Sequence, residues 1–105
     1  MELKEVQEKV DDWINQYSLG YWKPLAIMAR LTEEIGELAR EINHNFGPKK
    51  KKDSENVRNI SDEISDVFFT LICMANSLDV DMNDAFEKTM EKISSRDKNR
   101  WEKKQ

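Results

Sequence analysis

The segment that decides the fold runs from Pro24 to Ile42 and reads PLAIMARLTEEIGELAREI. Leucine, isoleucine and methionine recur in it at steps of three and four residues, at positions 25, 28, 31, 35, 38 and 42, which is the spacing of one face of an α-helix. Proline suits the first turn of a helix, and Gly47-Pro48 predicts where this one ends. The sequence therefore predicts a long amphipathic helix between these two signals.

Three further segments show the same periodicity. They cover about residues 2–18, about residues 55–78 and a stretch that begins after Asp81. Asp81 is a typical N-cap residue, and in the helix that follows we expect Phe86 and Met90 to face inward. Because no segment alternates between apolar and polar residues at period two, the sequence predicts an all-α fold of four helices.

The chain has 105 residues, which is close to the commonest domain size. We expect a single domain over residues 1–105, with a basic tail from about residue 97. A chain of this length buries only roughly 60–65% of its unfolded surface, so a bundle of long helices would gain from a second copy. Trp13 and Tyr17 lie on the apolar face of the first helix, where we expect them in the core or in such a contact, with stacking on a base as the alternative. The expected fold is a four-helix bundle completed by oligomerisation.

Composition excludes several classes of protein. The net charge of −4 argues against a dedicated nucleic-acid binder. No run of about 18 apolar residues predicts a membrane span, and the N-terminus does not resemble a signal peptide. The one cysteine, Cys73, lies among apolar residues, as expected for a buried thiol in a reducing cytoplasm. The lysine run at 49–52 could be a solvated loop, a localisation signal, a nucleic-acid patch or a loop that closes over an anionic substrate.

Two acidic motifs on separate predicted helices indicate chemistry. Glu34 and Glu37 are three residues apart, and so are Glu63 and Asp66, so each pair shares one side of a helix. On their helix we expect Glu34 to flank the apolar core and Glu37 to lie one step further out, whereas Glu33 lies nearly opposite the apolar face. If the two helices pair as an antiparallel hairpin, the four carboxylates could share a cation, and oxygen ligands suit Mg²⁺ or Mn²⁺. The alternative is a solvated acidic face.

A third spacing, from Glu41 to His44, is the Glu-x-x-His pattern of di-iron carboxylate bundles. Those bundles need the pattern twice, and this chain has a single histidine. His44 is therefore expected either at the surface near the end of its helix or as a flat ring that lines a substrate pocket.

The residues around both motifs strengthen the interpretation. The segments PLAIMARLTEEIGELARE at 24–41 and DEISDV at 62–67 resemble the two motif helices of the MazG-type all-α nucleoside triphosphate pyrophosphohydrolases. The resemblance covers roughly residues 20–100 and is strongest to short, single-domain bacterial members. The paired motifs are specific, whereas either one alone is a weak signal.

The resemblance implies hydrolysis of (deoxy)nucleoside triphosphates to the monophosphate and pyrophosphate, a reaction that serves nucleotide-pool house-cleaning. It implies Mg²⁺, with Mn²⁺ as a substitute, and a homodimer or homotetramer. Glu34 or Glu37 would also activate the attacking water. The implied metal ligands are Glu34, Glu37, Glu63 and Asp66.

Further residues would contact the substrate. The resemblance implies that His44 contacts the base, and that Lys88, Lys92 and Arg96 on the last helix grip the phosphates. The rival interpretation is a non-enzymatic helical interaction module with an acidic face. Such a module would show no stabilisation by Mg²⁺.

Overall fold

The computed structural model describes residues 2–48 and 60–105 and contains no strand in these ranges. The all-α prediction is confirmed. Residues 55–59 of the expected third helix, and the lysine run, lie outside the described residues. Among those that are described, no helix is long and apolar enough to span a lipid bilayer. The four helices are α1 (Leu3–Asn15), α2 (Pro24–Phe46), α3 (Ile60–Ser77) and α4 (Met82–Arg96).

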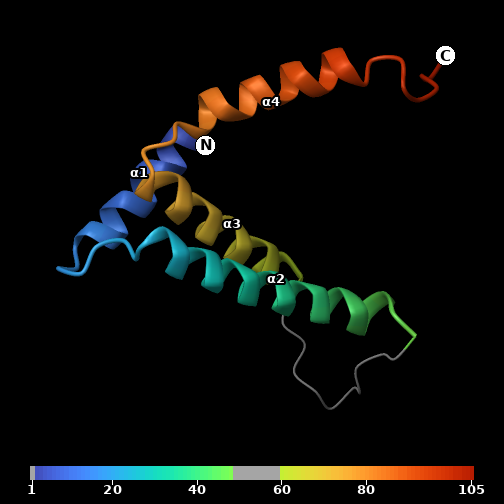
Figure 1. Cartoon of the computed structure of the whole chain (residues 1–105). Helices are drawn as coiled ribbons and strands as arrows, with labels where there is room; N and C mark the ends of the chain where they lie inside the picture. Colours follow the sequence, from blue (N-terminus) through green and yellow to red (C-terminus); the bar gives the residue numbers. More distant parts are fainter. Residues whose placement is uncertain (1, 49–59) are drawn as a thin grey trace.

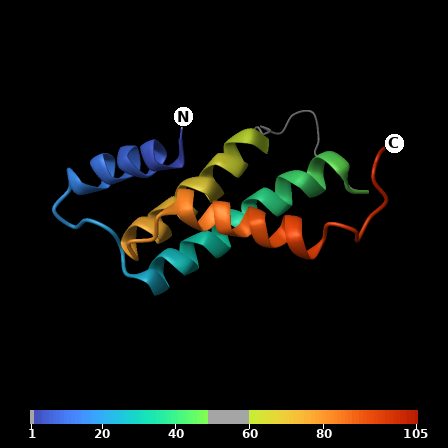
Figure 2. The ribbon, with the colours of Figure 1, turned by 90° about the horizontal axis from the view of Figure 1, so that it is seen from above.

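The helices α2 and α3 lie side by side and run in opposite directions (Figure 1). This antiparallel hairpin was predicted from the two periodic segments, and the structure confirms it. The helix α1 packs against the C-terminal half of α3, as the view from above also shows (Figure 2). The hairpin therefore places the acidic motifs of α2 and α3 opposite one another.

A small apolar cluster joins the first three helices. It consists of Val10 from α1, Ile27 from α2, and Ile72 and Cys73 from α3. Cys73 is a free, buried thiol, as the sequence predicted, and burial raises its pKa. The cluster is small for the length of the chain. The radius of gyration is 17.6 Å, whereas a compact domain of about 100 residues has about 13 Å.

The helix α2 buries only part of its apolar stripe: Leu31 is buried, and other members of the stripe are not. Ile35, in that stripe, is 50% exposed, whereas the neighbouring Glu34 is 3% exposed and Glu41 is fully buried. The expectation that Glu34 only flanks the core is therefore wrong. The reason is that α3 packs on the acidic flank of α2, so part of the apolar stripe is left facing outward.

The helix α4 begins as predicted and then leaves the rest of the chain. The Asp81 side chain accepts hydrogen bonds from the backbone N–H groups of Asn83 (2.9 Å) and Asp84 (3.2 Å). The helix contacts α1 and then extends away from the hairpin (Figure 1). Phe86 and Met90 are therefore 52% and 45% exposed, and the expectation that they face inward is wrong for a single chain, because no described element covers this face.

Candidate functional site

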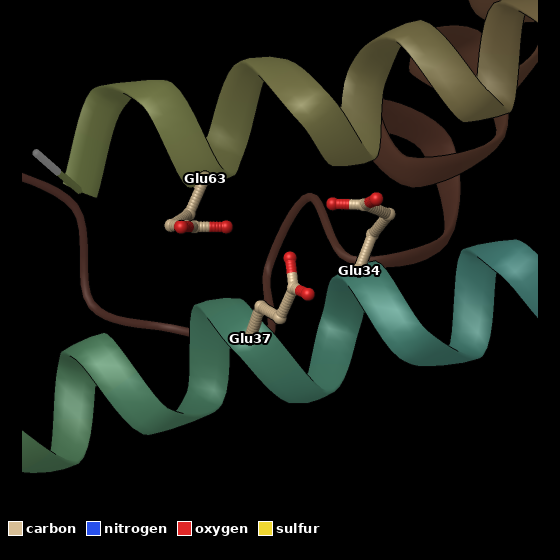
Figure 3. A group of neighbouring side chains, drawn as sticks. All are labelled: Glu34, Glu37 and Glu63. Atoms are coloured by element: carbon tan, nitrogen blue, oxygen red, sulfur yellow. The ribbon is translucent and has the colours of Figure 1, made fainter. Parts of the chain in front are cut away.

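Three carboxylates from the two halves of the hairpin converge. Glu34 and Glu37 point from α2 toward α3, and Glu63 points from α3 toward α2 (Figure 3). One oxygen from each residue lies within 4.8 Å of the others. Glu34 is 3% exposed and Glu63 is fully buried, while Glu37 is partly buried. The hairpin therefore concentrates negative charge in a place that water reaches poorly.

The surroundings of Glu34 show that this concentration of negative charge disfavours the ionised carboxylate. Burial raises the pKa of Glu34, the Arg30 guanidinium lowers it, and the carboxylates of Glu37 and Asp66 raise it further. The Arg30 Nη2 atom lies 2.6 Å from the Glu34 Oε1 atom. Even with this partner the pKa stays above its ordinary value, so one arginine does not offset the buried charge. A bound cation would stabilise the ionised cluster.

Asp66 lies beside this group rather than within it. It is one helical turn after Glu63 on α3 and is partly buried, and its charge acts on Glu34. Asp66 and Glu34 both line a cavity of about 270 Å³ that is bounded by α1, the segment leading into α2, α2 itself and α3. The structure thus gathers Glu34, Glu37 and Glu63 into one cluster and sets Asp66 at its edge.

The cavity has aromatic walls and a charged edge. The aromatic walls come from Tyr21, Trp22 and Phe69, and the charged edge includes Arg30 and Glu34. The sequence did not predict that these side chains share a site. The one available signal was Trp22, which precedes the proline at the start of α2 and does not fit an apolar helix face.

Glu41 is a further buried carboxylate, and in the sequence it stands out only through the Glu-x-x-His spacing. Glu41 is fully buried on α2, one turn beyond Glu37 and on the same face as Glu34. The spacing of three and then four residues from Glu34 to Glu37 to Glu41 predicts that the three carboxylates share one side of the helix. Its burial extends the acidic face that α2 presents to α3.

His44 continues the same face of α2, three residues after Glu41. It is partly buried, and its Nδ1 atom is shielded from solvent and has no hydrogen-bond partner in the described part of the chain. His44 does not line the cavity.

The three basic residues predicted to grip phosphate lie on α4, away from the carboxylates of the same chain (Figure 1). Lys88 pairs with Asp84 at 3.1 Å, and Arg96 pairs with Asp97 at 3.1 Å. Lys92 is exposed. Within one chain, the structure does not bring these side chains to the carboxylate cluster.

Comparison with known proteins identifies the family. Residues 23–101 match the model of the MazG nucleotide pyrophosphohydrolase domain. The chain belongs to the MazG nucleotide pyrophosphohydrolase family. Members of this family are hydrolases, so the chain is an enzyme rather than a non-enzymatic interaction module. The carboxylate cluster is the part of its fold that suits a divalent metal ion.

Individual relatives agree with this assignment over nearly the whole chain. Protein YpjD of Bacillus subtilis (strain 168) is 50% identical over 103 residues, which are 98% of this chain and 93% of YpjD. The crystal structure of YPJD from Bacillus subtilis has a TM-score of 0.81 and covers 88% of this chain and 94% of that one, at 50% identity. The crystal structure of the Bacillus-conserved MazG protein, a nucleotide pyrophosphohydrolase, is 47% identical with a TM-score of 0.80, and the match covers 94% of this chain and 96% of that one.

Proposed function

We propose that this enzyme hydrolyses (deoxy)nucleoside triphosphates to the monophosphate and pyrophosphate in a Mg²⁺-dependent reaction. The observation that carries the proposal is the convergence of Glu34, Glu37 and Glu63, each with an oxygen within 4.8 Å of the others. Residues 1–105 would act as one domain, in the cytoplasm, to clear unwanted triphosphates from the nucleotide pool.

The donor set fits a hard divalent cation. Carboxylate oxygens on one Mg²⁺ lie at most about 4.2 Å apart, which is twice the ion–oxygen distance. The oxygens of the cluster lie within 4.8 Å of one another, so small side-chain adjustments would suffice. Asp66, whose charge acts on Glu34, would complete the set. Mn²⁺ prefers similar ligands. When bound, the cation would neutralise charge on the phosphate oxygens and on the departing pyrophosphate.

The residues of the chain would supply the proton acceptor. Water adds to phosphorus, the bond to the bridging oxygen breaks, pyrophosphate leaves, and a carboxylate takes the proton of the water. Glu34 or Glu37 would fill this role.

The nucleoside would lie at one end of the cluster. The aromatic cavity adjoins Glu34, and its rings offer flat apolar surface to a base. His44 is ten residues further along α2, or about 15 Å, and is the second candidate for a base contact. Replacing His44 or Trp22 with Ala in a substrate panel distinguishes the two ends, since only the residue that contacts the base changes the ranking of the substrates.

The working enzyme would be a homodimer or homotetramer. Apolar side chains of both hairpin helices face outward: Ile35 on α2 is 50% exposed, and Ile64 and Phe68 on α3 are 53% and 41% exposed. Trp13 and Tyr17 on α1 are 55% and 54% exposed, which favours an oligomer contact over a place in the core. A second copy would also bring a further α4 helix, so that Lys88, Lys92 and Arg96 would serve the site of a neighbouring subunit.

Two measurements test these proposals. A panel of canonical and modified triphosphates with Mg²⁺, scored for pyrophosphate and for inorganic phosphate, should yield pyrophosphate, and release of single phosphates instead would contradict the reaction. Sedimentation of wild type and of Ile35→Glu tests assembly, with Ala29→Glu on another face of α2 as the matched control. A wild-type monomer at high micromolar concentration would contradict the oligomer.

A further inference from the structure

The hydroxyl of Tyr21, a residue that lines the cavity, is held from two sides. The hydroxyl donates to the Oδ1 atom of Asp11 on α1. It accepts a hydrogen bond of 2.9 Å from the Nδ2 atom of Asn76 at the end of α3. The Tyr21 ring lines the cavity next to Glu34, whereas neither Asp11 nor Asn76 does. The hydroxyl is therefore engaged with residues outside the cavity, and the part of Tyr21 left to a ligand is its ring.

The orientation of the Asn76 amide is fixed by further contacts. Its Nδ2 atom also donates to the backbone oxygen of Gln7 at 3.0 Å, and its Oδ1 atom accepts from the Nε2 atom of Gln7 at 2.7 Å. An amide has two donors and one carbonyl oxygen. With these bonds made, the group that faces Tyr21 can only be a donor. Burial and the Asp11 carboxylate raise the pKa of Tyr21 to about 12, so the phenol keeps the proton that it gives to Asp11.

Gln7 carries the same network to α4. Its Nε2 atom also donates to the backbone oxygen of Val80 at 2.8 Å, and its Oε1 atom accepts from the backbone N–H of Met82 at 2.9 Å. Met82 is the first residue of α4. One network of side chains thus ties α1, the α3–α4 turn and the Tyr21 ring together.

The Tyr21 ring needs these hydrogen bonds because it lies outside the regular helices. Tyr21 follows Gly20 in the non-helical segment between α1 and α2, and Gly20 adopts φ of 67°. A side chain in such a segment is not oriented by a regular helix, and its hydrogen bonds have to supply that order. A wall that is fixed before the ligand arrives reduces the entropy lost on binding.

We propose that Asn76 and Asp11 are positioning residues of this enzyme. They hold the Tyr21 ring as a fixed wall of the cavity and so set how tightly the enzyme binds the base of its nucleoside triphosphate. The inference rests on the proposed function and deepens it. Because the hydroxyl is already engaged, Tyr21 selects a ligand by flat contact rather than by reading its hydrogen-bonding groups.

The test compares the substrate dependence of pyrophosphate release in wild type, in four single variants and in one double variant. Asn76→Asp keeps the shape of the side chain and removes both donors. Tyr21→Phe keeps the ring and removes the hydroxyl, and Asp11→Ala removes the acceptor. The matched control is Asp12→Ala, which makes the same change of charge on the exposed side of α1. Competitive inhibition by inorganic triphosphate, which has no base, is measured for each protein.

We expect KM for the nucleoside triphosphate to rise about three- to tenfold in Asn76→Asp, Asp11→Ala and Tyr21→Phe, the loss that follows from one hydrogen bond. The kcat value and the inhibition by inorganic triphosphate should stay as in wild type, and the Asp12→Ala control should show no change. Asn76→Asp added to Tyr21→Phe should raise KM no further, because Asn76 acts through the Tyr21 hydroxyl.

Four results would overturn the inference while the variants stay helical by circular dichroism. They are an unchanged KM, a fall in kcat alone, an equal loss of affinity for inorganic triphosphate, and additive effects of Asn76→Asp and Tyr21→Phe. If Asn76→Asp does not fold, Asp11→Ala decides the matter, because Asp11 is only partly buried on α1. Absence of pyrophosphate release by wild type overturns the proposed function itself and the positioning role with it.

Discussion

Replacing Glu37 with Gln should stabilise the metal-free protein and remove its response to Mg²⁺. Of the three clustered residues, Glu37 gives the substitution that is simplest to interpret, because it is only partly buried and is not the partner of Arg30. The substitution removes one negative charge from a group whose oxygens lie within 4.8 Å of one another. Each repulsion that involves Glu37 then disappears.

The separation sets the magnitude. Two unit charges at the 4.8 Å limit of the cluster repel by about 3.5 kcal/mol at an effective dielectric constant of about 20. Protonation limits the total repulsion energy. A carboxyl of ordinary pKa takes up a proton at pH 7 at a cost of about 3.7 kcal/mol, so stronger repulsion would be relieved in that way. Solvent around the partly exposed Glu37 lowers the figure further, and we expect a gain of about 1–3 kcal/mol. In a domain of about 100 residues this corresponds to about 4 °C or more per kcal/mol.

The assay is urea or thermal unfolding at one protein concentration, with a chelator and then with Mg²⁺. Mg²⁺ at a hundred times its Kd should stabilise wild type by about 2.7 kcal/mol and should leave Glu37→Gln nearly unchanged. Glu33→Gln is the matched control: it lies on the same helix, its side chain is 66% exposed and it is 3.3 Å from Arg30. It should shift stability by less than about 0.5 kcal/mol and keep the Mg²⁺ response. A less stable Glu37→Gln in chelator, or one that Mg²⁺ still stabilises, would refute the reasoning.

Three further outcomes are expected. Glu63→Ala and Asp66→Ala should each abolish Mg²⁺-dependent pyrophosphate release with the helical circular dichroism spectrum intact, and near-wild-type turnover in either would remove that residue from the ligand set. Gly20→Ala should lower the free energy of unfolding by about 1–2 kcal/mol, because Gly20 has φ of 67°, and an unchanged urea midpoint would contradict this. The pKa of Tyr21 is raised from 10.0 to about 12, so its stabilising contribution is complete below pH 10 and is lost as the pH rises through 12. Denaturation curves measured as the pH rises from 10 through 12 should show this loss of stability in wild type and not in Tyr21→Phe.

The hairpin and its carboxylates could be predicted from the sequence because both depend on local spacing. Apolar residues at steps of three and four define α2 and α3, and paired acids three residues apart must share a side of their helix. Glu34, Glu37 and Glu63 meet as the motifs suggested. The same spacing could not give the facing of α2, since it assumes that apolar residues turn inward. Here Glu34 is buried and Ile35 is half exposed.

Other features depend on contacts between distant parts of the chain. The inward facing of Phe86 was a reasonable expectation for a bundle, but α4 extends away from the hairpin and leaves this side chain 52% exposed. The bonds from Asn76 to Gln7 and Tyr21 join residues 69 and 55 positions apart. Polar groups at such separations leave no periodic signal, so the wall of the cavity emerges only from the folded chain.

The bonds of Gln7 and Asp11 also bear on where the domain begins. The match to the MazG family model starts at residue 23, after α1 and after Tyr21. A fragment cut to residues 23–101 would lose Val10 from the apolar cluster, both side chains that connect α1 to Asn76 and Tyr21, and the part of the aromatic wall that Tyr21 and Trp22 form. We therefore expect the folded unit to be longer than the stretch that the family model matches, and a fragment made for expression should begin before α1.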